Sequence, residues 1–192
     1  RAALADKAAS RAEGRRLRRA LVLVAAVLLL AGGCKRQTPP ADTLVVGQVA
    51  APRSLDPQVT TALNDFRILV NLYEGLVRYR PGTLELAPGL AASWTVSDDG
   101  RVYRFKLREG VRFHDGSRFD AAAVRFNFQR MLEPEHPFHD TGPFPLAFFF
   151  EQVERVVAED PLTVRFELSR PFAPFLSNLA YPAALMVSPA AV

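Results

Sequence analysis

The chain has 192 residues, of which 49% are apolar and 23% are charged, a composition typical of a globular protein with one or two small domains. The first 33 residues contain seven of the 24 basic and two of the 20 acidic side chains, which leaves 17 basic and 18 acidic side chains in the remainder. The remainder therefore has a net charge of −1, and its composition does not favour a protein that binds nucleic acid.

The beginning of the chain has the features of an export signal. Basic residues in Arg15–Arg19 precede the apolar run Leu21–Ala31, which is shorter than the roughly 20 residues that a membrane-spanning helix needs. Two glycines then precede Cys34, the only cysteine of the chain. This stretch resembles the lipobox of bacterial lipoproteins, although Ala31 stands where Leu is commoner. The resemblance implies cleavage before Cys34 and lipid on its sulfur, the alternatives being an uncleaved anchor or a plain secretory signal.

The next segments are short and differ in character. Polar residues with two prolines predict a tether at 34–43, and a Val-rich run predicts a buried strand at 43–50. Turn formers predict a loop at 51–62, and a helix follows it, with Asn64 or Asp65 as its N-cap. The apolar face of this helix consists of Phe66, Leu69, Val70 and Tyr73.

A β-hairpin is the clearest local signal. A short strand is expected at 76–80, and Asp99-Gly100 then marks the turn between two longer strands. After this turn, apolar side chains alternate with basic ones, which predicts a half-buried strand with Trp94 packed across the pair. The alternating apolar residues are Tyr103, Phe105 and Leu107.

The second half of the chain predicts a helix, a hairpin and two shorter elements. Asp120 is the expected N-cap of a helix whose apolar face contains Val124, Phe128, Met131 and Leu132. The elements expected after it are a Pro-rich loop at 133–145, a hairpin formed by 152–158 and 162–168, a short helix within 170–180 and a buried strand at 184–189.

The stretch "LAPGLAASWTVSDDGRVYRFKLREGVRFHDGSRFDAAAVRFNFQRM" resembles the hallmark segment of the family 5 extracellular solute-binding proteins, the receptors of peptide- and nickel-type ABC importers. The motifs "SLDPQ", "LYEGLV" and "LSRPFAPFLSNLA" match on either side. The last of these, together with "HPFH", is most similar to the dipeptide-binding branch. The resemblance covers about residues 44–192.

The resemblance implies a mixed α/β chain with the two-lobed fold of class II periplasmic binding proteins. We expect this chain to be an N-terminal fragment that contains the start of lobe I and its inserted α+β subdomain, without the second lobe and most of the ligand pocket. The expected parts are a signal peptide at 1–33, a tether at 34–43, lobe I at 44–82, the inserted subdomain at 83–182 and a return to lobe I at 183–192.

The resemblance also implies a function. We expect a monomeric lipoprotein without enzymatic activity or cofactor, held at the periplasmic or cell-surface face of a membrane by lipid on Cys34. It would capture short peptides and deliver them to an ABC permease, with Thr61, Ala62 and Leu63 lining the ligand cleft through their backbone groups. The alternative for these three residues is a solvent-facing loop before a helix. Nickel, haem or oligosaccharide is the alternative ligand, and a secreted lipoprotein hydrolase that uses His114 is an alternative from another class.

The pair His114-Asp115 admits three interpretations. It could form a metal site with His136 and His139, it could act in catalysis, or Asp115 and Gly116 could only form a turn. We favour the turn, because nothing in the spacing requires a metal site and no nucleophile-elbow motif is present.

Three other features are ambiguous. Asp98 and Asp99 could bind calcium or belong to the hairpin turn, and we favour the turn. The aromatic run Phe148–Phe150 could be core or exposed surface, and we favour core. A stripe of basic residues could contact anionic lipid, although we favour a solvated strand face with acidic neighbours. The stripe consists of Arg101, Arg104, Lys106, Arg108 and Arg112.

Overall fold

A computed structural model describes residues 40–192, so the predicted export signal, Cys34 and most of the predicted tether at 34–43 lie outside the described residues. The chain divides into two units, one ending at Gly47 and the other running from Gln48 to Val192. Residues 40–47 are exposed and contain one turn, closed by a 3.0 Å hydrogen bond from the Thr43 N–H to the Pro40 carbonyl.

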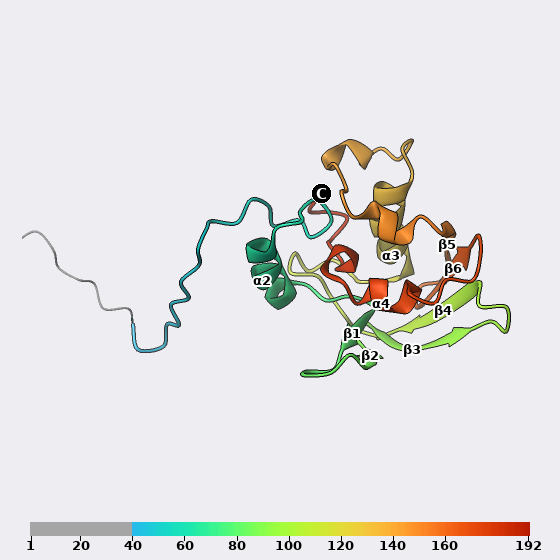
Figure 1. Ribbon diagram of the computed structural model, residues 1–192, viewed down its shortest axis with the longest axis horizontal. Coiled ribbons are helices and arrows are strands. Elements are labelled where there is room, and N and C mark those ends of the chain that lie inside the picture. The colour runs from blue at the N-terminus through green and yellow to red at the C-terminus, as the bar shows by residue number, and fades with distance from the viewer. Residues whose placement is uncertain (1–39) are drawn as a thin grey trace, which may run out of the picture. The chain divides into compact units, whose positions relative to one another are not determined.

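The second unit holds all the regular elements of the described chain (Figure 1). Its α-helices are α2 (Leu63–Leu72), α3 (Ala121–Leu132) and α4 (Phe175–Leu179). Its strands are β1 (Val77–Tyr79), β2 (Leu86–Pro88), β3 (Ala91–Val96), β4 (Val102–Leu107), β5 (Val153–Asp160) and β6 (Thr163–Leu168). Short 3₁₀ turns occupy His139–Thr141, Ala147–Phe150 and Pro182–Ala184. Within residues 40–192, no helix is long and apolar enough to cross a membrane.

A four-stranded antiparallel sheet in the order β3-β4-β6-β5 forms the centre of the second unit. Tyr103 and Phe105 of β4 are buried while Arg104 and Lys106 are exposed, which confirms the predicted alternation. The turn between β3 and β4 contains Gly100 at φ +67°, a backbone angle that glycine adopts without steric cost. Strands β1 and β2 form a separate two-stranded antiparallel sheet.

The exposed face of the four-stranded sheet is polar, and its basic side chains have acidic neighbours. Arg104 pairs with Glu159 at 3.2 Å, and Lys106 Nζ lies 3.9 Å from Asp160 Oδ2. Lys106 also donates to the hydroxyl of Thr163, which is buried. For Arg104 and Lys106, these ion pairs agree with the favoured interpretation of the basic stripe, a solvated strand face with acidic neighbours. The other three arginines of the stripe donate to backbone carbonyls instead.

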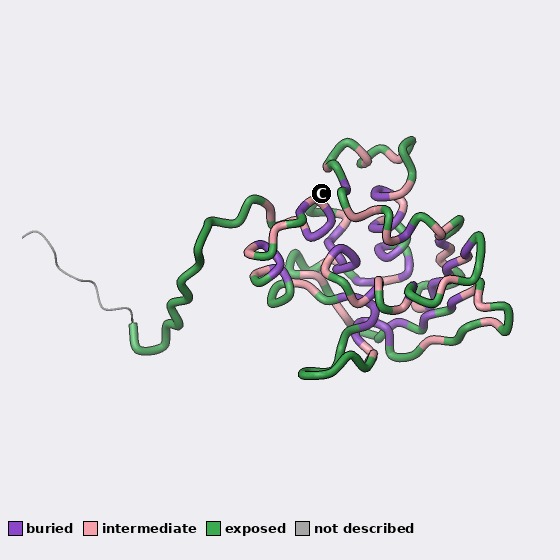
Figure 2. Tube along the Cα trace, viewed as in Figure 1, coloured by how far each residue is buried: buried purple, intermediate pink, exposed green. Residues whose placement is uncertain are grey.

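The core lies between the other face of the sheet and helices α3 and α4, as the purple segments of Figure 2 show. Aromatic rings join the layers: the Phe128 and Phe166 centroids are 4.9 Å apart, and those of Phe166 and Phe175 are 5.4 Å apart. Helix α3 begins as predicted, because the Asp120 carboxylate accepts a 2.9 Å hydrogen bond from the Ala123 N–H. Val124 and Phe128 on its predicted apolar face are fully buried.

Two predicted strands are wrong. The 43–50 run contains no strand, and Leu44 and Val49 are 87% and 92% exposed, because a strand needs a hydrogen-bonding partner and no described segment pairs with it. The 184–189 run is buried as predicted but is irregular. The backbone N–H of Met186 donates to the Glu74 carbonyl and that of Val187 to a side chain, so no ladder forms.

Two smaller predictions also need correction. Helix α2 begins at Leu63 with Ala62 as N-cap, so neither Asn64 nor Asp65 caps it. The aromatic run is divided rather than wholly core, because Phe148 is 59% exposed and Phe150 is fully buried.

Candidate functional site

The residues predicted to contact a ligand lie where the loop 51–62 enters helix α2. Thr61 is exposed, Ala62 is half-buried, and the Leu63 side chain is 66% exposed. Ala62 has an extended backbone (φ −79°, ψ 126°). Neither the N–H nor the carbonyl of Thr61 forms a hydrogen bond with any part of residues 40–192. The structure therefore brings the three residues together at the surface, with backbone groups at Thr61 that nothing in the described chain pairs.

A buried carboxylate holds the backbone beneath these residues. Asp65 is fully buried, its Oδ2 accepts a 2.6 Å bond from the Thr60 hydroxyl, and its Oδ1 accepts a 3.1 Å bond from the Arg53 N–H. The Thr60 hydroxyl in turn accepts a bond from the Ala62 N–H. The hydrogen bond from Thr60 holds the pKa of Asp65 below its ordinary value, although burial acts in the opposite direction.

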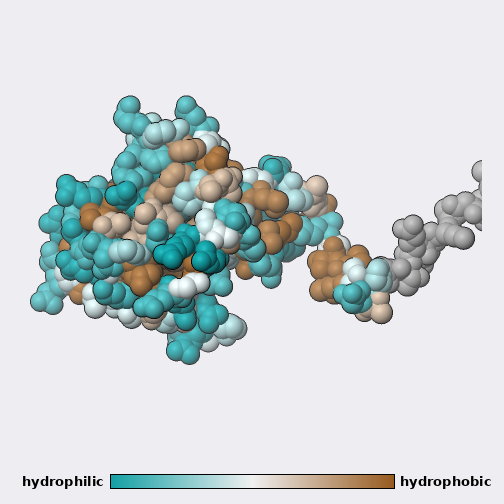
Figure 3. Space-filling model, turned by 180° about the vertical axis from the view of Figure 1, so that it is seen from behind, coloured by the Kyte–Doolittle hydropathy of each residue, from teal (hydrophilic) through white to brown (hydrophobic). Residues whose placement is uncertain are grey.

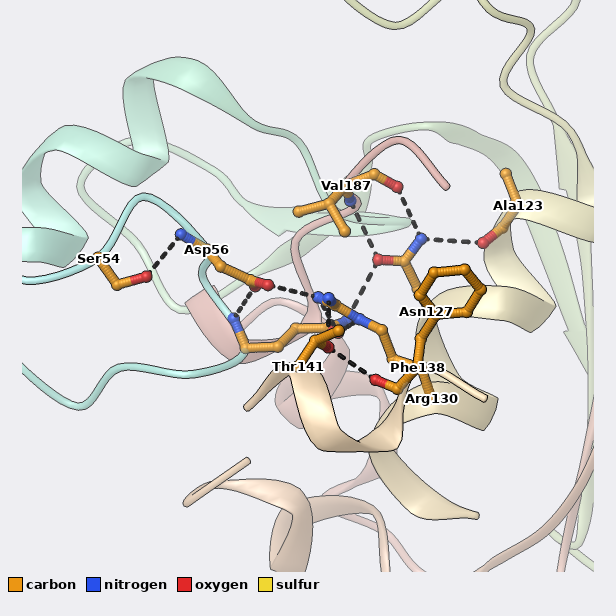
Figure 4. A network of polar contacts seen from close by, with 9 residues as sticks. Ser54, Asp56, Ala123, Asn127, Arg130, Phe138, Thr141 and Val187 are labelled. Carbon is orange, nitrogen blue, oxygen red and sulfur yellow. Dashed lines mark hydrogen bonds and ion pairs between the residues drawn. The ribbon is translucent and has the colours of Figure 1, made fainter. Parts of the chain in front are cut away.

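The middle of the loop is held by helix α3. The Arg130 guanidinium is completely buried, and its Nη2 donates to Asp56 Oδ2 and to Gln58 Oε1, both at 2.8 Å (Figure 4). The Asp56 carboxylate also accepts a 2.9 Å bond from the Gln58 N–H, which closes a local turn. The guanidinium completes its contacts with the Thr141 hydroxyl at 3.4 Å.

The same helix holds the C-terminal segment of the described chain. Asn127 Nδ2 donates to the Val187 carbonyl at 2.9 Å, and the Val187 N–H donates to Asn127 Oδ1 at 3.0 Å. Asn127 Oδ1 also accepts a 3.3 Å bond from Gln58 Nε2, so the loop and the C-terminal segment are connected through one side chain. We call Asp56, Gln58, Asn127, Arg130 and Thr141 the Arg130 network.

The Pro-rich loop supports the candidate site from another side. A Cβ atom at Gly142 would overlap the Val59 side chain, so only glycine permits this approach. The His139 ring packs 5.5 Å from the Phe144 ring, and the Arg130 guanidinium lies 5.4 Å from the centroid of the same ring. Neither His139 nor His136 meets His114 in a metal site, since residues 40–192 contain no group of three or more possible metal ligands from His, Cys, Asp and Glu.

His114 and Asp115 form the favoured turn. The Asp115 carboxylate accepts bonds from the Ser117 N–H at 2.8 Å and the Ser117 hydroxyl at 2.6 Å, and Gly116 has φ +84°. The bond from the Ser117 hydroxyl, another from the Ser188 hydroxyl and that from the Ser117 N–H hold the pKa of Asp115 below its ordinary value. Ser188 donates to Asp115, and no hydrogen bond joins His114 to a serine in the described chain, so a Ser–His–Asp arrangement is not formed.

A cleft of about 570 Å³ lies beside this turn, lined among others by Tyr73, His114 and Ser188. Thr61, Ala62 and Leu63 do not line it. In the neighbouring hairpin, the Asp99 carboxylate accepts bonds from the Ser97 hydroxyl and the Arg101 N–H, which agrees with the favoured turn rather than a calcium site.

The sequence interpretation missed the Arg130 network. Its signal is visible on helix α3, because Asn127 and Arg130 fall on the same side as Val124 and Met131, where an amphipathic helix carries apolar residues. A polar residue on a buried helix face needs partners, and a systematic search for such positions would have identified both side chains.

Comparisons with known proteins give the relatives of this chain. The family model of the bacterial extracellular solute-binding proteins, family 5 Middle, matches residues 85–191. Di/tripeptide-binding protein 2 of Pseudomonas aeruginosa is 41% identical over 168 residues, which cover 81% of this chain and 31% of that protein. The chain thus spans about a third of the length of this curated relative.

Solved structures of similar proteins support the same family relationship. The dipeptide-binding protein from Pseudoalteromonas sp. SM9913, in complex with Met-Leu, is 32% identical with a TM-score of 0.68, covering 74% of this chain and 30% of that one. NikA from Brucella suis, in complex with Fe(III)-EDTA, is 34% identical with a TM-score of 0.59, covering 71% of this chain and 26% of that one. These structures share the fold of the described region while their ligands differ.

Proposed function

Since the chain belongs to the bacterial extracellular solute-binding proteins of family 5, we propose that it is part of a receptor that captures short peptides for an ABC importer. Its fold is that of part of a class II periplasmic binding protein, as predicted from the sequence. Members of this family bind substrates, and the receptor would deliver the peptide to the permease subunits without chemical change.

The observation that carries this proposal is the backbone at Thr61, which nothing in the described chain pairs. An unpaired N–H and carbonyl on an exposed residue, in a segment anchored by Asp65 and Arg130, can pair with an extended peptide as an added strand would. Main-chain pairing suits peptides of varied sequence, because every residue except proline carries the same donor and acceptor. The relatives that bind dipeptides and tripeptides support this ligand class.

We further propose that lobe I comprises residues 44–82 and 183–192 and that residues 83–182 form the inserted subdomain. A second lobe would cover the peptide from the other side, and tight binding needs this enclosure. The 192-residue chain alone is therefore expected to bind Met-Leu too weakly for calorimetry at micromolar concentration. Micromolar affinity of this chain would contradict the two-lobed proposal.

The ligand loop is tested in the full-length protein expressed from its gene. Thr61→Pro removes the N–H that would bond to the peptide, and Thr61→Ala is the matched control because it keeps the N–H. We expect Thr61→Pro to raise the Kd for Met-Leu about fivefold, as the loss of a hydrogen bond worth about 1 kcal/mol would do. Unchanged unfolding temperatures would show that both variants fold.

Two outcomes of this titration would count against the proposal. Equal affinity of Thr61→Pro and Thr61→Ala for Met-Leu would show that the N–H of residue 61 does not bind the peptide. A wild-type protein that binds nickel, haem or an oligosaccharide instead of Met-Leu would keep the receptor function and replace the ligand class.

Membrane attachment through Cys34 is proposed on the resemblance to a lipobox alone. Acyl chains on this residue would hold the monomeric receptor at the periplasmic or cell-surface side of a membrane. Expressed with its signal, the wild-type protein is expected to partition into a detergent phase and Cys34→Ala into the aqueous phase. Wild-type protein in the aqueous phase would instead indicate a plain secretory signal.

A further inference from the structure

One helix holds the two segments that flank the sheet-containing part of the chain. Arg130 of α3 binds the loop at Asp56 and Gln58, and Asn127, one turn earlier, binds Val187. These contacts join residues that are 60 to 74 positions apart in the sequence. The close view in Figure 4 shows side chains from the loop and from α3, together with the backbone of Val187 in the C-terminal segment, converging on one polar cluster.

The network is fully satisfied. The guanidinium donates to Asp56, Gln58 and Thr141, and no buried side-chain nitrogen or oxygen within residues 40–192 lacks a hydrogen-bond partner. The Arg130 charge is fully buried while its partner Asp56 is 24% exposed, and well-packed apolar residues in place of a buried charge and its partner are often as stable. The role of Arg130 is therefore better explained by its effect on the conformation of the loop than by an effect on overall stability.

Asp65 holds the two ends of the loop through Thr60 and Arg53, and the Arg130 network holds its middle. Residues 53–62 contain no helix or strand, and their backbone bonds are local, such as the 3.4 Å bond from the Val59 N–H to the Asp56 carbonyl. Gln58 is 1% exposed and accepts two hydrogen bonds from Arg130 on its amide oxygen. The position of Gln58 thus depends on the guanidinium, and Thr61 follows three residues later.

We propose that Arg130 is a positioning residue for peptide binding, which fixes the backbone of Thr61–Leu63 through Asp56 and Gln58 without touching the ligand. This inference rests on the proposed function of that loop. The guanidinium is completely buried, so it acts only through the residues that it holds. Arg130, in the proposed inserted subdomain 83–182, would therefore set the geometry of Thr61–Leu63, which lie in the proposed lobe I.

The first test measures the order of the loop and needs no ligand. Amide hydrogen exchange is followed by mass spectrometry in Arg130→Met, Asp56→Asn, the double variant and the control Arg125→Met on the exposed side of α3. The double variant removes both charges and leaves neither buried alone, and the Asp56→Asn change keeps a side-chain oxygen that can accept from the Gln58 N–H.

We expect the double variant to unfold near the wild-type temperature while amides within residues 54–63 exchange about tenfold faster, the effect of losing interactions worth about 1.4 kcal/mol. Exchange in β3–β6 should match the wild type. Arg125→Met should behave as the wild type throughout. Unchanged exchange in residues 54–63 of the double variant would overturn the positioning role.

The second test measures the Kd for Met-Leu in the full-length protein with the same variants. A Kd about tenfold above the wild-type value in the double variant, at an unchanged unfolding temperature, would support positioning, since a purely stabilising residue would leave the Kd intact at equal stability. An unchanged Kd with a loosened loop would overturn it. A wild-type protein that fails to bind Met-Leu would refute the peptide proposal, and the exchange result would then decide the role of Arg130 by itself.

Discussion

Single carboxylates stabilise the loops of this protein by accepting several hydrogen bonds each. Asp65 binds a hydroxyl and a backbone N–H beneath the candidate site, and Asp115 binds Ser117 and Ser188 at the turn. The hydroxyl donors are the largest cause of the lowered pKa of both side chains, because they favour the ionised form. Ionised carboxylates are therefore part of the folded structure at both positions.

The lowered pKa values predict how stability depends on pH. A carboxylate whose pKa is lower in the folded than in the unfolded chain stabilises the fold above the unfolded value of about 4, and this stabilisation is lost as the pH falls through the folded value. We expect Asp115→Asn to lower the urea midpoint at pH 7 and to differ less from the wild type near pH 3. Asp98→Asn, in the hairpin turn, is the control. If the urea midpoints of wild type and Asp115→Asn differed more at pH 3 than at pH 7, this account would be contradicted.

At the scale of elements, helix α3 contacts the sheet, the loop 51–62 and the C-terminal segment, and it holds all three in place. It covers the buried face of the sheet with Phe128, supports the loop with Arg130 and holds the C-terminal segment with Asn127. Its first turn is stabilised by the Asp120 carboxylate. Helix α2, in contrast, has no side-chain cap and carries exposed apolar residues such as Leu63 and Val70. Figure 3 shows hydrophobic areas interrupting a mostly hydrophilic surface on the face opposite to Figure 1.

The cap of α3 can be tested by substitution. Asp120→Ala leaves the Ala123 N–H without its partner and is expected to lower the free energy of unfolding by about 1 kcal/mol, measured by urea denaturation. Asp120→Ser keeps a hydroxyl acceptor and should cost less. Equal losses for the two variants would show that charge, rather than the hydrogen bond, stabilises the helix start.

For the whole molecule, the described chain combines a well-packed unit with an exposed apolar segment. Leu44, Val45 and Val46 face solvent, whereas the residues between the sheet and α3 are almost fully buried. An exposed segment without hydrogen-bonded partners is accessible at little free-energy cost, while opening of the sheet requires exposure of its aromatic core.

This difference predicts the order of proteolysis. Elastase, which cleaves after small apolar residues, should cut the chain within residues 44–50 before any bond within residues 85–187, as followed by mass spectrometry. A substitution that loosens the core, such as Phe128→Ala, should speed cleavage of the second region and leave the first unchanged. Protection of residues 44–50 in the wild type would show that another segment or a second molecule pairs with them.

Local patterns determined most of the regular elements. The alternation of Tyr103, Phe105 and Leu107, the Asp99-Gly100 turn and the Asp120 cap each involve neighbouring residues, so the sequence alone predicted β3, β4 and the start of α3. The fold class was predicted through the family resemblance. The motifs that carry this resemblance are also local and lie mainly within residues 85–191, which the family model matches. The contact of Thr61–Leu63 with a ligand stays a prediction, because a surface position suits both a ligand-lining segment and a solvent-facing loop.

Only the tertiary structure decided which hydrogen-bond partners the backbone groups and the buried charged side chains have. Val-rich residues 43–50 and residues 184–189 both read as strands, yet strand formation depends on a distant partner that local composition does not specify. Asp65 reads as a cap, and it became a buried acceptor because Thr60 and Arg53 fold back onto it. The Arg130 network joins residues more than 60 positions apart in the chain, so no local pattern could have revealed which groups it would connect.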